Sequence, residues 1–198
     1  MRDDVDVLLF DLGGVLLELN DPAATFGIDG DVDTYHRRWL TSPAVLEFER
    51  VAIDPQQFAA RVIREAGLPY PADAFLERFN AWPGALFDGA LPLLDELGRH
   101  FRLALLSNTN TSHWHADGVS DRLEPRFEHL FLSYETGLLK PDEDAFAHVV
   151  STLGAAPDTI LFFDDSALNV ESARRCGLQA ERVLGPADVR HILNVACG

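Results

Sequence analysis

Four short apolar runs, each ending at or shortly before polar residues, constrain the fold of this chain more than any other feature of its sequence. The runs are Val7–Phe10, Leu103–Leu106, Leu130–Leu132 and Ile160–Phe163, and a weaker fifth run lies at Arg182–Leu184. Apolar runs of this length, bounded by turn signals, are typical of strands that are buried on both faces of a parallel sheet.

Helical patterns lie between these runs. We expect helices at Gly89–Phe101, Pro141–Leu153 and Ser166–Cys176, the last of which is followed by Gly177, a common helix stop. Alternation of strands with helices predicts an α/β fold with a doubly wound parallel sheet.

Residues from about Leu19 to Gly84 break this alternation, because they contain helical patterns and no convincing strand. Four helices are expected there, at Asp33–Leu40, Pro43–Arg50, Pro55–Glu65 and Ala72–Ala81. We interpret residues 19–84 as a helical insertion that lies over the strand ends. Residues 1–18 and 85–198 then form the core domain, which fits one domain with a sizeable insertion in a chain of 198 residues.

Charge and composition limit the partners. The net charge of −16 argues against binding to nucleic acid and to anionic membrane surfaces. No apolar run approaches membrane-spanning length, and no signal peptide is evident at the N-terminus. Cys176 and Cys197 show no paired spacing, so we expect a reducing, cytoplasmic location without a disulfide framework.

Polar clusters follow the four clearest strands. They are Asp11–Gly14, Ser107–Asn110, Lys140–Pro141 and Asp164–Ser166. Because the strands are expected to run parallel, all four clusters should meet at one edge of the sheet, where ligands of open α/β sheets bind.

The carboxylates in these clusters suit a metal ion. Asp11, Asp164 and Asp165 would bring together hard oxygen ligands, which Mg²⁺ prefers. A carboxylate that is not fully occupied by metal can also attack phosphorus and form an aspartyl phosphate. Asp11 is therefore the candidate nucleophile.

The other members of the clusters suit a phosphoryl group. Ser107, Asn108 and Lys140 would donate hydrogen bonds to its oxygens, and Gly13 and Gly14 would let backbone N–H groups approach it closely. Lys140 is the one lysine beside fifteen arginines in the chain, which is consistent with a chemical role for its compact ammonium group. Each cluster alone could be an ordinary turn or helix cap, and their combination favours a site.

At these residues the chain resembles the haloacid dehalogenase superfamily. The four motifs of that superfamily are matched in order by Phe10–Leu16, Leu105–Asn110, Gly137–Pro141 and Phe162–Asn169. The helical insertion is similar to the cap that many members carry after the first strand. Within the superfamily, the chain is most similar to bacterial sugar-phosphate phosphatases, such as those for α-glucose 1-phosphate, and to the phosphatase domain of epoxide hydrolases.

The resemblance implies a Mg²⁺-dependent phosphatase of a small phosphorylated metabolite, such as a sugar phosphate. It assigns Asp11 as nucleophile, Ser107 and Asn108 to phosphate binding, and Lys140 to a bridge between nucleophile and phosphate. It also assigns Asp165 to the metal, with Asp164 as a ligand either directly or through water.

One position departs from the superfamily pattern. Most phosphatases of this type carry a second aspartate two residues after the nucleophile, and here that residue is Gly13. Its backbone carbonyl can still bind the metal, but the acid/base is lost, which costs about 10²–10⁴-fold in rate. Asn169 likewise stands where an aspartate is common.

Three alternatives remain open from the sequence. A haloacid dehalogenase would also lack the second aspartate, but it needs no metal, so the pair Asp164–Asp165 disfavours it. A phospho-accepting receiver domain is shorter and carries its acidic pair at the first strand. A domain of this fold with weak or no catalysis is the third.

Specificity residues are expected on the cap. Candidates for its inner face are His36, Trp39, Glu47, Phe48 and Arg50. We expect His113 and His115 to lie at the surface or at a helix start rather than to bind a metal.

Overall fold

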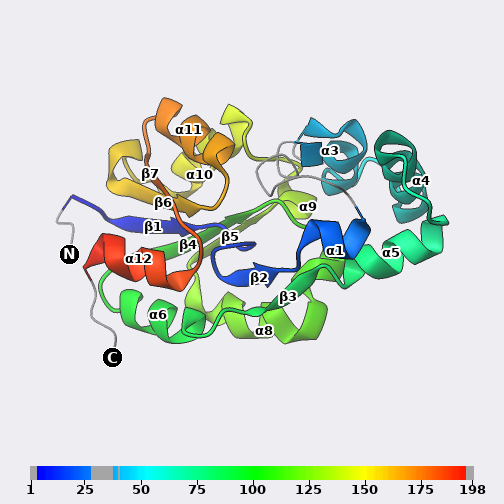
Figure 1. Ribbon diagram of the computed structural model, residues 1–198. Helices are drawn as coiled ribbons and strands as arrows, with labels where there is room; N and C mark the ends of the chain where they lie inside the picture. The colour runs from blue at the N-terminus through cyan, green and yellow to red at the C-terminus, as the bar shows by residue number, and fades with distance from the viewer. Residues whose placement is uncertain (1–3, 28–37, 40, 195–198) are drawn as a thin grey trace.

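A five-stranded parallel sheet forms the centre of the molecule, described here from a computed structural model over residues 4–27, 38–39 and 41–194. Its strands are β1 (Val7–Phe10), β4 (Arg102–Ser107), β5 (His129–Leu132), β6 (Ile160–Asp164) and β7 (Gln179–Arg182). Their order is β5-β4-β1-β6-β7, and all neighbouring pairs are parallel (Figure 1). The predicted doubly wound sheet is therefore confirmed, with β1 at its centre.

Helices cover both faces of the sheet (Figure 1). One layer contains α6 (Ala90–Leu97), α8 (Val119–Leu123) and α12 (Pro186–Leu193), and the other contains α10 (Glu143–Leu153) and α11 (Ala167–Arg175). Alternate residues of β1 pack against opposite helix layers. Leu8 and Phe10 lie in the core beneath α6 and α12. Val7 and Leu9 lie in the core beneath α10 and α11. A strand buried on both faces therefore reads as a continuous apolar run.

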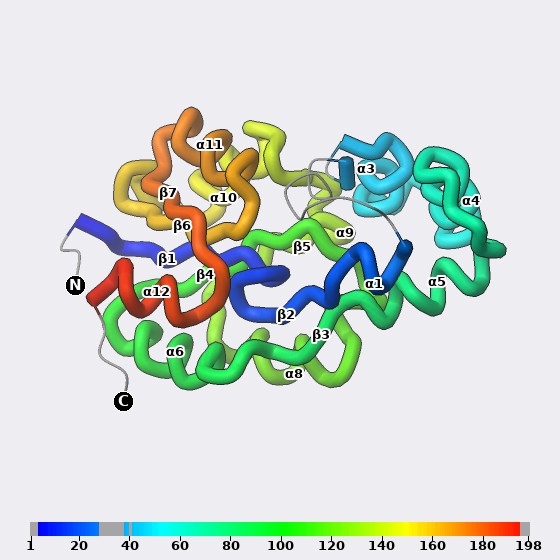
Figure 2. Tube along the Cα trace, in the orientation of Figure 1, coloured from blue at the N-terminus to red at the C-terminus, as the bar shows by residue number. Residues whose placement is uncertain are grey.

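The inserted segment has a core of its own. Its described helices are α1 (Pro22–Phe26), α3 (Pro43–Glu49), α4 (Pro55–Ala66) and α5 (Ala72–Asn80), which gather at one end of the molecule (Figure 2). Their contact surface is strongly aromatic: Phe58 stacks on Phe48 at 4.2 Å between ring centroids, and Phe26, Phe75 and Phe79 are buried with them. We call this helical unit the cap.

A two-stranded antiparallel ribbon joins the cap to the sheet. It consists of β2 (Leu17–Leu19) and β3 (Pro83–Leu86), so the expectation that residues 19–84 contain no strand is wrong at both edges. The strands are short and show no alternation, and Pro83-Gly84 is a typical turn signal. A Cβ on Gly84 would lie 3.1 Å from the backbone oxygen of Glu18, so glycine permits this close pairing. The division at residues 18/19 and 84/85 remains our proposal.

Element ends differ from the predictions by a few residues. The helix expected at Gly89–Phe101 is α6, which ends at Leu97. The strand expected at Arg182–Leu184 is β7, which lies three residues earlier, and Leu184 beyond it is 66% exposed. β7 pairs with β6 alone and forms a sheet edge, so it lacks the continuous apolar run of a central strand. The helix expected at Asp33–Leu40 lies almost entirely outside the described residues.

Short elements were not predicted from the sequence. Besides α1, α8 and α12 they are α7 (Thr111–Trp114), α9 (Ser133–Thr136) and the 3₁₀ turns Ala116–Gly118, Glu124–Arg126 and Pro157–Thr159. Helices of one turn contain too few residues for a periodic pattern. This reason does not apply to α12, whose eight residues are enough for such a pattern. No helix in the described part of the chain is both long and apolar enough to cross a membrane.

Candidate active site

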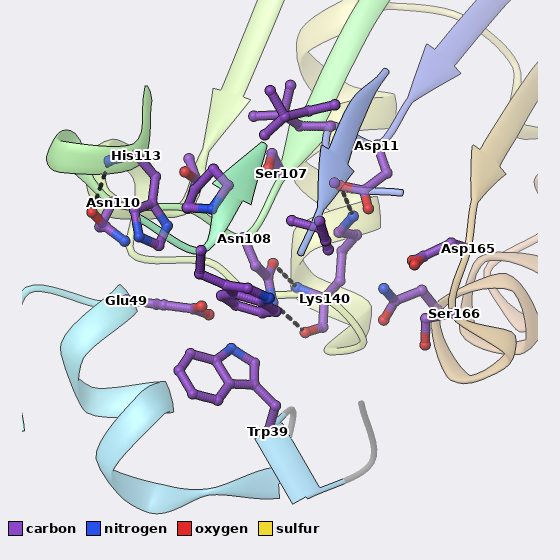
Figure 3. Close-up of a pocket in the computed structure, with 18 of the residues that line it drawn as sticks. Asp11, Trp39, Glu49, Ser107, Asn108, Asn110, His113, Lys140, Asp165 and Ser166 are labelled. Atoms are coloured by element: carbon purple, nitrogen blue, oxygen red, sulfur yellow. Dashed lines mark hydrogen bonds and ion pairs between the residues drawn. The ribbon is translucent and has the colours of Figure 1, made fainter. Parts of the chain in front are cut away.

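A cavity of about 110 Å³ lies between the carboxyl ends of the sheet strands and the cap (Figure 3). The core side of its wall contains Asp11, Gly13, Ser107, Asn108, Lys140, Asp165, Ser166 and Asn169. The side formed by the cap and the ribbon contains Leu17, Leu19, Trp39, Glu49, Phe79, Trp82 and Pro83. The sheet therefore brings polar residues from loops after β1, β4, β5 and β6 into one cavity.

Lys140 lies at the centre of the polar wall. Its ammonium nitrogen Nζ lies 2.7 Å from Asp11 Oδ1 and 2.7 Å from Asp164 Oδ2, and the residue is 1% exposed. Its backbone is held by the side chain of Asn108, which donates to the Lys140 carbonyl at 2.8 Å and accepts from its N–H at 2.9 Å. Burial works to lower the pKa of Lys140, but the two carboxylates raise it to about 12, so the group stays charged.

Asp164 positions this lysine. Its oxygens also accept hydrogen bonds from the Ser166 backbone N–H at 2.8 Å and from Asn169 Nδ2 at 3.0 and 3.1 Å. Asp164 is fully buried and does not line the cavity. In this structure Asp164 acts on the site through Lys140, and its role as a metal ligand, directly or through water, stays a prediction.

The three carboxylates at this end of the sheet fit a divalent cation. Oxygens of Asp11, Asp164 and Asp165 all lie within 4.8 Å of one another, and Lys140 is the one ammonium group lining the described cavity. Burial, followed by repulsion from neighbouring carboxylates, raises the pKa of Asp165, and burial also raises that of Asp11. The Asn169 Oδ1 atom is buried without a hydrogen-bond partner among the described residues. These oxygen atoms exceed the cations available to them, and oxygen atoms of this kind are the ligands that Mg²⁺ prefers.

Two glycines shape the loop after β1. A Cβ on Gly14 would lie 2.4 Å from Asp165 Oδ2, and Gly14 has φ +73°, so glycine is required for Asp165 to approach this loop. The Gly14 N–H donates to the Leu17 carbonyl at 2.8 Å, so in this structure it already has an acceptor within the protein and does not face a phosphate as predicted. Gly13 lines the cavity, where a Cβ would meet the end of the Leu19 side chain at 3.1 Å.

Ser107 ends strand β4 and lines the cavity beside Asn108. The loop that follows is fixed by Ser133, whose hydroxyl donates to the Thr109 carbonyl at 2.8 Å and accepts from the Thr109 N–H at 2.9 Å. Ser107 is therefore held at the cavity wall, and its hydrogen bond to a phosphoryl oxygen stays a prediction. The Asn108 side chain also holds the Lys140 backbone, and its predicted contact with a phosphoryl oxygen stays a prediction.

Of the five cap residues predicted to face the site, Trp39 alone lines the cavity, and His36 lies outside the described residues. Phe48 packs within the cap core. Glu47 pairs with Arg61 at 2.8 Å, and Arg50 bonds to Asp142 of the core domain at 2.6 Å. Pattern reasoning thus found the right helix but the wrong face.

Glu49 is the cap residue that the sequence analysis missed. It lies one helical turn after the buried Val45, so its position on the inward face could have been inferred from the helical period. Phe79 and Trp82 also line the cavity. The sequence does not show whether an aromatic residue in a cap packs in its core or lines a cavity. These two residues do both.

His113 is buried and lines the cavity rather than lying at the surface. It lies in α7, as a helix-start role predicts, and its Nε2 donates to the Phe79 carbonyl at 2.8 Å. Burial lowers its pKa to about 4 even though this hydrogen bond works to raise it, so the ring is neutral at pH 7. His115 is exposed and contacts Ser120. Neither histidine belongs to the described carboxylate cluster.

Comparison with known proteins identifies the family. The family model for haloacid dehalogenase-like hydrolases matches residues 5–177, and the chain belongs to this family. It is similar to a D-ribitol-5-phosphate phosphatase of Bacteroides thetaiotaomicron, with 24% identity over 95% of this chain and 96% of the relative. It is also similar to a sesquiterpene phosphatase of Aspergillus oryzae, with 27% identity over 86% of this chain and 85% of the relative.

A solved structure supports the same assignment. A family enzyme from Bacteroides thetaiotaomicron, crystallised with magnesium and inorganic phosphate, matches with a TM-score of 0.69 and 27% identity. The match covers 90% of this chain and 93% of that one.

Removal of the Lys140 ammonium group should destabilise the folded protein. We predict that Lys140→Met lowers the free energy of unfolding by about 3–5 kcal/mol, because it leaves Asp11 and Asp164 buried without their cation. Arg61→Met, which breaks the exposed pair with Glu47, should cost only about 0–1 kcal/mol. Urea unfolding at pH 7.5 measures both. Equal, small losses would contradict the charge arrangement described here.

Proposed function

We propose that this chain hydrolyses the phosphate monoester of a small, hydroxyl-bearing metabolite through an aspartyl phosphate on Asp11. The chain is a phosphatase of the haloacid dehalogenase-like family and uses Mg²⁺. The observation that carries the proposal is the buried group of Asp11, Lys140 and Asp165 at the floor of one cavity.

Asp11 is the nucleophile in this mechanism. Its carboxylate attacks phosphorus, the bond from phosphorus to the leaving-group oxygen breaks, and that oxygen takes a proton from water. A water molecule then attacks the phosphorus of the aspartyl phosphate, releases inorganic phosphate and restores the carboxylate. The bond from Lys140 Nζ to Asp11 Oδ1 holds the carboxylate in one orientation before the substrate arrives.

The other polar groups neutralise charge on the phosphoryl group or hold the reacting groups in position. Lys140 also offsets negative charge on the phosphoryl oxygens, and Ser107 donates a hydrogen bond to one of them. Asp11, Asp165 and the Gly13 carbonyl would hold Mg²⁺, which neutralises further charge in the transition state. Asn108 and Asp164 act indirectly, since they hold Lys140.

The size of the cavity supports a small leaving group. Pockets that bury drug-sized ligands span roughly 300–1,000 Å³, and this cavity measures about 110 Å³. Of the two named relatives, one acts on a five-carbon polyol phosphate and the other on a much larger terpenoid phosphate. The cavity is more compatible with a substrate of the first kind.

Two other functions fit less well. A dehalogenase needs no metal, so it gives no reason to bury Asp165 beside Asp11 and Asp164. A domain without catalysis would not need a lysine fixed between a candidate nucleophile and a second carboxylate at 2.7 Å.

The phosphatase assignment has a direct test. We expect phosphate release from a panel of phosphorylated metabolites in the presence of Mg²⁺, and a loss of at least about 10³-fold in Asp11→Asn. Asp121→Asn, an exposed aspartate on α8, is the matched control and should retain full activity. Release that is equal in wild type and Asp11→Asn would refute the proposed function.

Gly13 yields a second prediction about the leaving group. Without a carboxylic acid at this position, alkyl leaving groups should depart slowly compared with more acidic aryl or anomeric ones. Gly13→Asp should raise kcat/KM on alkyl phosphates by about 10²–10⁴-fold and much less on aryl phosphates. The new Cβ meets only the flexible end of Leu19, so the substitution should be accommodated.

Gly13→Ala is the control for this experiment, because it adds the same Cβ without a carboxylate. A leaving-group series of kcat/KM on wild type and both variants measures the effect. If alkyl phosphates gain no more than aryl phosphates in Gly13→Asp, another group already supplies the proton and the prediction is wrong.

A further inference from the structure

Glu49 stands out among the cap residues because its carboxylate enters the cavity. It is the last residue of α3, and the helix stops there because the Ala52 N–H bonds to the Glu47 carbonyl and the Val51 N–H bonds to the Phe48 carbonyl. Glu49 is 6% exposed. Figure 3 shows its side chain directed from α3 into the pocket, on the far side from Asp165.

One oxygen of this carboxylate has no hydrogen-bond partner among the described residues. The indole N–H of Trp39 hydrogen-bonds to the Glu49 side chain, but Oε2 is buried and accepts nothing from the described residues. A buried acceptor left without a donor costs roughly 1–3 kcal/mol, so such atoms in native proteins call for an explanation. An oxygen that faces a cavity can be satisfied by the molecule that fills it.

The charges around Glu49 suit an uncharged ligand group that donates a hydrogen bond to it. Burial raises its pKa to about 7, and Asp11 works in the same direction, whereas the Trp39 hydrogen bond, Lys140 and Arg50 oppose the rise. At neutral pH the group therefore carries only part of a full negative charge. A hydroxyl can bond to either protonation state of this carboxyl group, because it both donates and accepts.

The cavity sets the direction of the substrate. A phosphoryl group bound at Asp11 and Lys140 occupies the core side, so the rest of the molecule extends toward the cap wall. That wall is apolar at Phe79 and Trp82, and Glu49 is its buried carboxylate. A carbon chain would pack on the rings, and one of its hydroxyl groups would reach the carboxylate.

We propose that Glu49 Oε2 accepts a hydrogen bond from a hydroxyl of the leaving group, and that this contact selects polyol or sugar phosphates over alkyl phosphates. The proposal rests on the proposed function and adds a specificity residue to it. Recognition of this kind discriminates strongly, because an analogue without the hydroxyl leaves the buried acceptor unpaired.

Glu49→Leu tests the proposal, with two substrates of equal chain length as probes. D-Ribitol 5-phosphate and n-pentyl phosphate both release a five-carbon primary alcohol, and they differ in their hydroxyl groups. Wild type should favour the polyol by at least about 10-fold in kcat/KM. Glu49→Leu should lower kcat/KM on ribitol 5-phosphate by about 10–100-fold, chiefly through KM, and leave n-pentyl phosphate within about 3-fold.

Stability and a matched variant separate function from structure. Glu49→Leu should keep or raise Tm, because it replaces a buried, incompletely paired carboxylate in an aromatic setting with an apolar group. Glu47→Leu makes the same change two residues earlier on α3, at a side chain paired with Arg61 outside the cavity. It should leave the preference for the polyol unchanged.

Four results would overturn the proposal. A wild-type preference near or below one, or an unchanged preference in Glu49→Leu, would show that this oxygen contacts no substrate hydroxyl. Equal losses on both alkyl substrates with p-nitrophenyl phosphate spared would make Glu49 a proton donor instead. Phosphate release no greater than in Asp11→Asn, on every probe, would overturn the proposed function as well.

Discussion

The buried ammonium of Lys140, held between Asp11 and Asp164, is the interaction on which the rest of the site depends. Burial of an ammonium that is 1% exposed is costly, and the two carboxylates 2.7 Å away offset that cost. The ammonium in turn offsets the cost of burying the carboxylates. The parallel sheet makes this possible, since β1 and β6 are neighbours and end at the same edge. Asn108, after β4, fixes the lysine from the other side.

The core side of the site was predictable from the sequence because each part of it depends on a strand end. Val7–Phe10 and Ile160–Phe163 are unambiguous buried strands, so the positions of Asp11 and Asp165 followed from topology alone. What the sequence could not provide was the direction of each side chain. Asp164 ends β6 and Asp165 follows it, yet one holds Lys140 and the other lines the cavity, and this difference depends on the direction of each side chain where the strand ends.

The cap side was harder to predict for a physical reason. A small helical unit with an aromatic core presents similar residues to its core and to a ligand, so Phe48 and Trp39 could not be told apart by residue type. Glu49 was overlooked although the period of α3 places it with Val45. We propose different roles for the two walls of the cavity. The core domain binds and transfers the phosphoryl group, whereas the cap determines which substrate is bound.

The carboxylates around Lys140 leave a net negative charge that a divalent cation would balance. Thermal unfolding of the protein at pH 7.5 with increasing Mg²⁺ tests it most directly, with Asp165→Asn as the comparison. The account predicts a saturable rise in Tm for wild type, since a ligand of the native state stabilises it, and little or no rise for Asp165→Asn. An unchanged Tm in wild type, or an equal rise in both proteins, would contradict it.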